Sequence, residues 1–475
     1  MKIAIEGCCH GELDAIYAQI GALEQRNKYK VDLLLICGDF QAVRNHRDLQ
    51  CMAVPDKYRQ LGGFYKYYTG EKAAPVLTIV IGGNHEASNY LWELYHGGWL
   101  APNIYFLGHA GCVQVNGVRI AGASGIFKPQ DFRQGHWERV PYNHGSMRSI
   151  YHIREFNVRK LSLLSSPTIF LSHDWPQSIE HHGNLPELLR RKPYFREDIK
   201  KGALGSPPMM GLLHTLQPEW WFAAHLHCRF EARVVHETPA ASGASIGTSA
   251  VDKNPDEIAI EDDDDADEKA ETTEAEAEVS PINNGDVAAA PRNSDEIVLD
   301  DEEEDIVAPP PAPLPPAETR FLALDKCLPR RQFLEIVDVP VPASFTPPSN
   351  SSGPVLAYDA EWLAITRAFH PYMSVNRSQI PFPDEAQARE AVRRELEWVR
   401  SNVLEGNREK SVDECQQFVM TAPAPGSEGA ALKQQPPHYP NPQTAAFCAM
   451  LGIENRIDPP PSLSSHPSHV PTDQV

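Results

Sequence analysis

Five short apolar runs, each followed at once by polar side chains, constrain this chain more than any other feature of its sequence. The clearest run, at residues 75–81, is rich in β-branched residues and passes directly into Gly-Gly-Asn-His-Glu at residues 82–86. Apolar runs of this length that end at glycine are typical of buried strands. Open α/β folds keep their sites at the carboxyl ends of their strands. The sequence therefore predicts an α/β protein with a site at one sheet edge.

Four further apolar runs, at residues 2–6, 31–36, 168–171 and 220–224, repeat this arrangement, and residues 12–27 have helical spacing. The side chains that follow the five runs are thiols, imidazoles, a carboxylate and an amide, which all bind divalent metals. They are Cys8, His10, Asp39, Asn84, His85, His173, His225 and His227. Each alone fits an ordinary role, such as a buried thiol or a turn residue. Their joint occurrence at five strand ends favours a metal site.

The net charge of −21 belongs almost entirely to one segment. Residues 251–305 contain 23 Asp and Glu against 3 Lys and Arg, which leaves a net charge of −1 for the rest of the chain. The acidity therefore does not exclude an RNA or DNA substrate. Residues 237–318 are also poor in apolar side chains and end in a Pro-rich run, so they cannot bury enough surface to offset chain entropy. We predict a disordered insert there, which expands a loop between two strands.

The remaining segments differ clearly in pattern. Short apolar runs over 104–128, two of them joined by Asn-Gly, predict strands and a hairpin, whereas residues 128–160 are irregular and interleave cations with aromatic side chains. Residues 384–404 have the spacing of a helix. Residues 421–475 are rich in Pro, Ser and Gln, and we predict that they are mostly disordered apart from one short helix near 445–453.

Cysteine usage and the apolar runs indicate the compartment. Nine cysteines without dense spacing favour a reducing compartment. The first residues run straight into a strand, which is not the pattern of a signal peptide, and no apolar run reaches 18 residues. We expect an intracellular protein with no membrane partner. The basic cluster at 190–192 has the composition of an ordinary solvated face.

The order of the five motifs resembles the calcineurin-like metallophosphoesterase superfamily, with Cys8 where that superfamily usually has Asp and Ala224 where it has Gly. Within the superfamily, Cys8 and the longer motifs resemble the RNA lariat debranching enzymes. These longer motifs are at 38–45, 82–89, 124–128 and 172–176, with shorter ones at 148–152 and 204–207. The resemblance covers residues 1–236, resumes near 319–335 and extends over 355–420.

The resemblance implies an α/β metallophosphoesterase sandwich of two mixed sheets flanked by helices, with a small, mainly helical C-terminal domain. Residues 1–236 would form the catalytic domain, which includes a lariat recognition loop at 128–160. Residues 237–318 would be the insert and residues 421–475 the tail. Residues 319–420 would hold the end of the catalytic sheet and the C-terminal domain.

The resemblance also assigns roles in the site. One metal site would use Cys8, His10, Asp39 and His227, and the other would use Asp39, Asn84, His173 and His225. Asp39 would bridge the two, and metal-activated hydroxide would attack the phosphorus while His85 protonates the leaving 2′-oxygen. Glu86 and Asp174 would orient neighbouring histidines. The cofactor would be one or two ions of Fe²⁺, Zn²⁺ or Mn²⁺, and the soft thiolate of Cys8 leaves the occupancy of its own site open.

The substrate implied is the 2′,5′-phosphodiester at the branch point of an excised intron lariat, and no DNA substrate is expected. Cations and aromatic rings of the recognition loop would contact RNA. These candidates are Lys128, Arg133, Trp137, Arg139, Tyr142 and Arg148. Splicing-related proteins are further candidate partners, and the family resemblance implies a location in the nucleus and also in the cytoplasm.

Two alternatives remain open at this stage. One is another metallophosphoesterase, such as a DNA nuclease or a protein phosphatase, with the same metal ligands and no preference for 2′,5′ linkages. The other is a scaffold that binds RNA or splicing proteins without turnover. The presence of both Asn84 and His85 argues against the scaffold.

Overall fold

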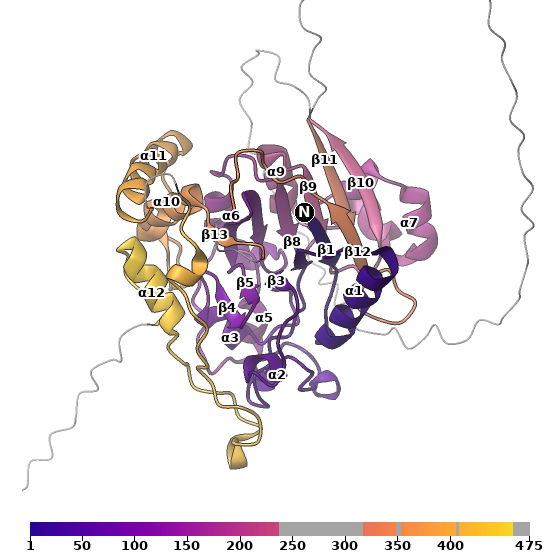
Figure 1. Cartoon of the computed structure of the whole chain (residues 1–475), viewed down its shortest axis with the longest axis horizontal. Coiled ribbons are helices and arrows are strands. Elements are labelled where there is room, and N and C mark those ends of the chain that lie inside the picture. The colour runs from indigo at the N-terminus through magenta and orange to yellow at the C-terminus, as the bar shows by residue number, and fades with distance from the viewer. Residues whose placement is uncertain (237–316, 348–352, 405–407, 459–475) are drawn as a thin grey trace, which may run out of the picture. The chain divides into compact units, whose positions relative to one another are not determined.

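The first of two sheets is mixed and carries three of the five predicted strand ends. The computed structural model describes residues 1–236, 317–347, 353–404 and 408–458 (Figure 1). The strands of this sheet follow the order β12 (Leu334–Asp338), β1 (Lys2–Glu6), β2 (Leu33–Ile36), β3 (Leu77–Val80), β5 (Ile104–Phe106) and β4 (Gly98–Ala101). β1, β2, β3 and β5 are parallel, and the two edge strands are antiparallel to their neighbours.

The second sheet has seven strands and is also mixed. Their order is β10 (Phe230–Val235), β11 (Glu318–Ala323), β9 (Trp220–Ala223), β8 (Ile169–Ser172), β7 (Val118–Ala123), β6 (Ala110–Val115) and β13 (Leu356–Tyr358). The parallel strands β7, β8, β9 and β11 form its centre. The predicted sandwich of two mixed sheets is therefore confirmed.

Alternation along the strands explains why two sheets pack together. Ile3 and Ile5 of β1 belong to the same buried core as Ile120 and Phe170 of the second sheet. Ala4, between them, faces the opposite side and belongs to the core that the adjacent helix α1 covers. Successive side chains of a strand point to opposite faces, so one strand contributes to both layers.

Helices cover the outer faces of the sandwich. They are α1 (Leu13–Asn27), α2 (Tyr65–Tyr68), α3 (Ser88–Glu93), α4 (Pro129–Phe132), α5 (His144–Ser149), α6 (Glu155–Leu161), α7 (Leu185–Arg191), α8 (Arg196–Lys201), α9 (Pro207–Leu216), α10 (Ala360–Phe369), α11 (Glu385–Asn402) and α12 (Pro442–Leu451). The predicted helices at 12–27 and 384–404 correspond to α1 and α11. The C-terminal helices α10, α11 and α12 gather together near β13 and β4 (Figure 1). None of the described helices is both long and apolar enough to cross a membrane.

The two predicted strand connections have the expected geometry. β6 and β7 pair antiparallel, and Asn116 and Gly117 between them have φ values of 51° and 78°, the left-handed conformations that such a tight hairpin requires. β10 and β11 also pair antiparallel, with Val235 opposite Glu318. The predicted insert at 237–318 therefore connects two adjacent strands, as predicted, but Glu318 already belongs to β11, so the insert ends before it. The disorder predicted for residues 237–316 concerns residues outside the described ones.

Two predictions about irregular segments need correction. Residues 128–160 contain three short helices, α4, α5 and α6, so they are not a continuous irregular loop. Residues 421–458 are packed against the catalytic domain, although a mostly disordered segment was predicted from composition. Gln443 and Thr444 are buried there, and Gln443 exchanges hydrogen bonds of 2.7 and 2.9 Å with the main chain of Trp99. Residues 459–475 lie outside the described part of the chain.

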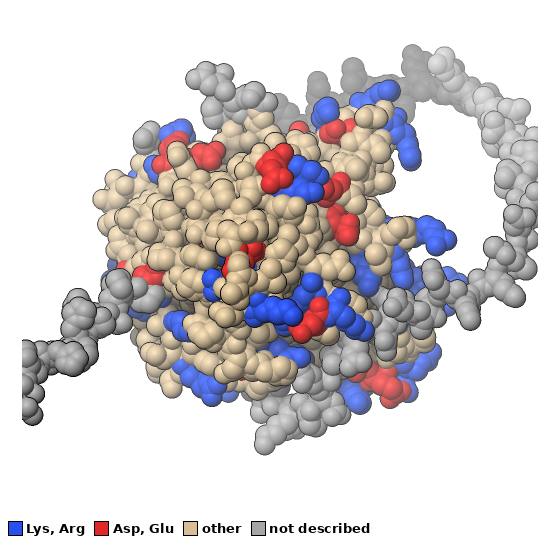
Figure 2. All heavy atoms as spheres, turned by 90° about the horizontal axis from the view of Figure 1, so that it is seen from below, with Lys and Arg blue, Asp and Glu red and all other residues tan. Residues whose placement is uncertain are grey.

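Lys and Arg side chains and Asp and Glu side chains are both scattered over the face shown in Figure 2, and uncharged residues make up most of that face. This distribution agrees with the near neutrality that the sequence assigns to the chain outside the acidic segment.

Candidate metal centre

The loops after β1, β2, β3, β8 and β9 converge, and four of their polar residues have left-handed backbones. The φ values are 45° for His10, 48° for Asp39, 64° for His225 and 48° for His227. Residues other than glycine seldom adopt this conformation, and those that do are concentrated at functional sites. These tight loops turn side chains from both sheets toward one place.

The Cys8 half of the centre contains four donors from three loops. The Sγ of Cys8 and donor atoms of His10, Asp39 and His227 all lie within 4.8 Å of one another. The Nε2 atoms of His10 and His227 are 3.4 Å apart, and His10 Nε2 is 3.7 Å from Asp39 Oδ2. Burial and the neighbouring His10 lower the pKa of His227 to about 2, so its imidazole is neutral, as a metal ligand must be.

The Asn84 half lies on the other side of Asp39. His173 Nε2 is 3.2 Å from Asn84 Oδ1 and 3.4 Å from Asp39 Oδ1, and the rings of His173 and His225 are 5.0 Å apart. Burial alone would raise the pKa of Asp39, but His173, His85 and His10 hold it well below its usual range. Asp39 is therefore an anion whose two oxygens face the two halves, which is the arrangement expected of a bridging ligand.

The donor set fits a divalent cation. A thiol, a carboxylate, imidazoles and an amide oxygen, brought together in a buried place, form a mixed set suited to Fe²⁺, Zn²⁺ or Mn²⁺. Burial and the charge of Asp39 raise the pKa of the Cys8 thiol well above its usual value. A cation bound beside the sulfur would have the opposite effect and favour the thiolate. The main-chain N–H of His225 already donates to the Cys8 sulfur at 3.2 Å.

Gly83 allows two of the loops to approach closely. A Cβ atom at Gly83 would lie 2.2 Å from Asp39 Oδ1 and 2.6 Å from the Asp39 main-chain nitrogen. We expect Gly83→Ala to lower the bound metal per chain at least about fivefold, since overpacking of about 1–3 kcal/mol would displace Asp39. Elemental analysis of the purified protein measures this. The matched control is Gly21→Ala in α1, where a Cβ meets nothing within 4 Å, and full metal content in both variants would contradict the expectation.

Comparisons with known proteins agree with this site. The family described as calcineurin-like phosphoesterase matches residues 1–229, and that described as lariat debranching enzyme, C-terminal domain, matches residues 316–456. The lariat debranching enzyme of Arabidopsis thaliana is 40% identical and the match covers 99% of this chain and 93% of that protein. That of Schizosaccharomyces pombe is 39% identical, with 98% and 99% covered. Lariat debranching enzyme A of Xenopus laevis is 42% identical, with 95% and 70% covered.

The chain belongs to the lariat debranching enzyme family. The predicted family resemblance, the phosphoesterase class and the two-domain architecture are thereby confirmed. The C-terminal match ends at residue 456 and not near 420, because the family's C-terminal domain includes the packed residues 421–456 as well.

In this member of the family, Glu86 and Asp174 have different partners from those predicted. The Glu86 carboxylate accepts hydrogen bonds from the main-chain N–H groups of Phe40 and Gln41, both at 2.8 Å, and of Gly83 at 2.9 Å. Glu86 thus ties the Asp39 loop to the Asn84 loop, although burial raises its pKa to about 7. Asp174 accepts from the N–H of Phe127 at 3.2 Å. Among the described residues, neither carboxylate is hydrogen-bonded to a histidine ring.

His173 is oriented by the backbone instead. Its Nδ1 lies 2.7 Å from the carbonyl oxygen of Cys37, at the end of β2. Because a carbonyl oxygen only accepts, Nδ1 is the donor in this contact, and Nε2 is directed toward Asn84 and Asp39. Burial opposes a charge on the His173 ring, but the charge of Asp39 outweighs it and raises the pKa of His173. A main-chain partner carries no side-chain signature, so the sequence could not identify it.

The six predicted RNA contacts fall into two groups. Lys128 and Trp137 are half-buried, and Arg133, Arg139 and Arg148 are exposed, so these five remain candidates. The guanidinium of Arg377 lies 4.2 Å from the centre of a ring of Trp137, so that face of Trp137 is already covered. The prediction for Tyr142 is wrong because its ring is only 5% exposed and lies in the main core.

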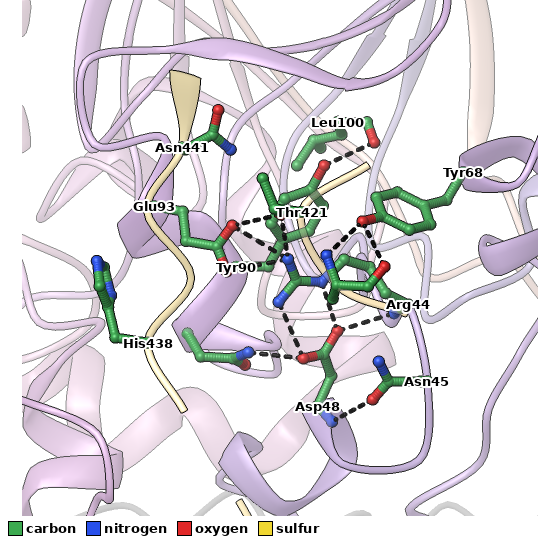
Figure 3. A network of polar contacts seen from close by, with 12 residues as sticks. Arg44, Asn45, Asp48, Tyr68, Tyr90, Glu93, Leu100, Thr421, His438 and Asn441 are labelled. Carbon is green, nitrogen blue, oxygen red and sulfur yellow. Dashed lines mark hydrogen bonds and ion pairs between the residues drawn. The ribbon is translucent and has the colours of Figure 1, made fainter. Parts of the chain in front are cut away.

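A buried ionic network that the sequence did not indicate lies next to the site (Figure 3). The Arg44 guanidinium donates to Asp48 at 2.8 and 3.1 Å, reaches Glu93 at 2.9 Å and donates to Thr421 at 2.8 Å. It also lies 3.9 Å from the ring centre of Tyr90. The network joins the segment after Asp39, helix α3 after the Asn84 loop, and the C-terminal segment. The spacing of Arg44 and Asp48 is a local signal, but their other partners are distant in the sequence.

Proposed function

We propose that the chain hydrolyses the 2′,5′-phosphodiester bond at the branch point of intron lariat RNA. Water adds to the phosphorus, the bond to the 2′-oxygen breaks, and the products are a 2′-hydroxyl and a 5′-phosphate on a linear RNA. The observation that carries the proposal is the convergence of Cys8, His10, Asp39 and His227 within 4.8 Å in a member of the lariat debranching family.

The residues of the two halves would hold the metal. Cys8, His10, Asp39 and His227 form one donor set, and Asp39, Asn84, His173 and His225 form the other. A divalent cation in such a set supplies Lewis-acid stabilisation of phosphate charge and activates water as a nucleophile. The soft thiolate favours Fe²⁺ or Zn²⁺ over Mg²⁺ in the Cys8 half, and Mn²⁺ is a third candidate.

His85 is proposed as the general acid that protonates the leaving 2′-oxygen. It is half-buried at the same loop as Asn84, so a substrate can reach its ring. Its main-chain N–H, not its ring, donates to Asp39 Oδ1 at 2.8 Å, and its ring centre lies 5.6 Å from that of His10. The backbone contact fixes the position of His85 while its imidazole stays available for proton transfer.

Recognition of the branched RNA is proposed to involve residues 128–160. Arg133, Arg139 and Arg148 are exposed and can meet phosphates, and Trp137 offers a partly covered ring for base stacking. The family membership also supports two broader proposals, action in the nucleus and also in the cytoplasm, and contact with splicing-related proteins.

Metal-dependent linearisation tests the proposed function. Protein stripped of metal is reloaded separately with Fe²⁺, Zn²⁺ or Mn²⁺ and given a circular lariat RNA, and the products are separated on a denaturing gel. We expect at least one of these ions to restore conversion of the lariat into a single linear RNA. Degradation to short fragments would favour the nuclease, and an intact lariat with metal bound would favour the scaffold.

A further inference from the structure

We propose that Arg377, in the C-terminal domain, is an RNA-binding residue whose guanidinium plane stacks on an unpaired base in one arm of the substrate. Trp137 supports this guanidinium from behind, and the pair is called here the Arg377 platform. The inference rests on the proposed function and deepens it, since it extends the recognition surface from residues 128–160 to the C-terminal domain.

The turn at residues 374–378 is laid along the predicted recognition segment. The N–H of Gly135 donates to the main-chain oxygen of Arg377 at 3.1 Å, and the N–H of His136 donates to that of Ser374 at 2.9 Å. These contacts lie on either side of one short stretch of backbone. The C-terminal domain therefore reaches directly into the segment that precedes Trp137.

The same turn is held in one conformation by its own hydroxyl group. The side chain of Ser374, which is 5% exposed, donates to the main-chain oxygen of Ser378 at 2.7 Å and to that of Asn376 at 3.2 Å. A Cβ atom at Gly135 would lie 2.2 Å from the Asn376 main-chain oxygen, so the glycine permits this close approach. The turn thus presents Arg377 from a fixed backbone.

Arg377 replaces Trp137 as the planar group that a base can reach. The Cζ atom of Arg377 lies 4.2 Å from the centre of a Trp137 ring, within the range of a cation–π contact. Trp137 is half-buried, whereas Arg377 is exposed. Unpaired RNA bases stack on guanidinium planes as well as on aromatic rings. The guanidinium face turned away from the indole is therefore the stacking surface.

The charge of the two segments suits an RNA backbone. Residues 128–139 and 374–378 contain four Lys and Arg against two Asp and Glu. The acidic side chains are both engaged inside the fold, since Asp131 is 9% exposed and lies 2.7 Å from His152, and Glu138 is 1% exposed and pairs with Arg154. Both acids are buried, while Arg377 stays exposed.

The recognition segment connects the metal centre to the Arg377 platform. At its start, the N–H of Phe127 donates to Asp174 at 3.2 Å, next to the ligand His173. Helix α4 then leads on to Trp137. Single-stranded RNA is held largely by stacking of its bases, so an arm that leaves the Asn84 half along α4 would meet the platform.

Binding of two RNA probes tests the stacking role. One is a fluorescein-labelled unbranched RNA of about 12 nucleotides, and the other is the same ribose-phosphate chain without bases. Each is added to the full chain with its metal, and anisotropy gives Kd. We expect Arg377→Lys, which keeps the charge and loses the plane, to weaken binding of the first probe at least about fivefold, the lower limit for one stacked base. Binding of the abasic probe should change less than about twofold, because phosphate contacts depend on charge.

Arg320→Lys is the matched control. The Cζ atom of Arg320 lies 5.1 Å from the centre of a Trp220 ring, and the Arg320 side chain is 50% exposed. The two residues pair where the parallel strands β9 and β11 begin, at the end of the sheet opposite the metal loops. The control should bind both probes as the wild type does.

Wild-type affinity of Arg377→Lys for the RNA with bases would overturn the assignment. Equal losses on both probes would also overturn it, because they would indicate a phosphate contact or a displaced segment. Lariat cleavage by a protein whose RNA binding does not respond to Arg377→Lys would reject the Arg377 platform alone. Weakening confined to the RNA with bases, in a protein that leaves lariats intact, would reject the proposed function alone.

Discussion

Replacing His85 with alanine is expected to lower kcat for lariat cleavage by about 10²–10⁴-fold and to leave the metal content unchanged. The size of the effect is that of losing a positioned general acid. Metal should stay because the contact with Asp39 comes from the His85 main-chain N–H at 2.8 Å, which alanine retains. Single-turnover rates and elemental analysis on the same preparation measure the two quantities.

A comparison of two substrates with different leaving groups shows whether His85 donates a proton or only supports the structure. A phosphodiester with a p-nitrophenolate leaving group needs little protonation, so His85→Ala should cleave it within about tenfold of the wild-type rate. The control is His181→Ala, whose side chain is 53% exposed, and it should match the wild type on both substrates. Equal losses on lariat RNA and on the activated ester would remove His85 as the acid.

Replacing Arg44 with alanine is expected to destabilise the fold by about 3–5 kcal/mol, the cost of leaving buried charges without their partner. Arg44, Asp48 and Glu93 all have side chains that are at most 1% exposed. Burial already raises the pKa of Glu93 to about 7, which Arg44 opposes, so removal of the guanidinium should drive Glu93 to its protonated form. Urea unfolding followed by tryptophan fluorescence measures the change in stability.

The matched control for Arg44 is a surface pair of the same type. Arg159 pairs with Glu155, four residues earlier on α6, at 2.9 Å. The side chain of Arg159 is 50% exposed. Arg159→Ala should cost no more than about 0.5 kcal/mol, since exposed pairs of this spacing contribute little. Similar small losses for both variants would show that the buried network does not hold the segment after Asp39 in place.

The ligands were predictable from the sequence because the signal is local. A strand is a short apolar run, its end is marked by glycine, and Cys8, Asp39 and Asn84 follow within a few residues of such ends. Parallel pairing then brings separate ends to one edge. The Asn-Gly hairpin at 116–117 was predictable for the same reason, since two adjacent residues determine the turn.

The remaining features depend on distant partners. Glu86 binds three main-chain N–H groups, and no side-chain pattern identifies such donors. Residues 421–458 have the composition of a disordered tail, but Gln443 and Thr421 are ordered by Trp99 and Arg44, more than 300 residues earlier. Tyr142 resembles a stacking residue in sequence and is a core residue in the fold. Local composition does not encode these long-range contacts.

Competition between the two linkages of one substrate molecule decides whether the protein is selective for 2′,5′-phosphodiesters. The substrate is a branched RNA whose single branch-point adenosine carries a 2′,5′-linked arm with one fluorophore and a 3′,5′-linked arm with another. With metal-loaded protein, we expect the 2′-linked arm to be released at least about 100-fold faster than the 3′-linked arm. Release of both arms at similar rates, or of neither with metal bound, would contradict it.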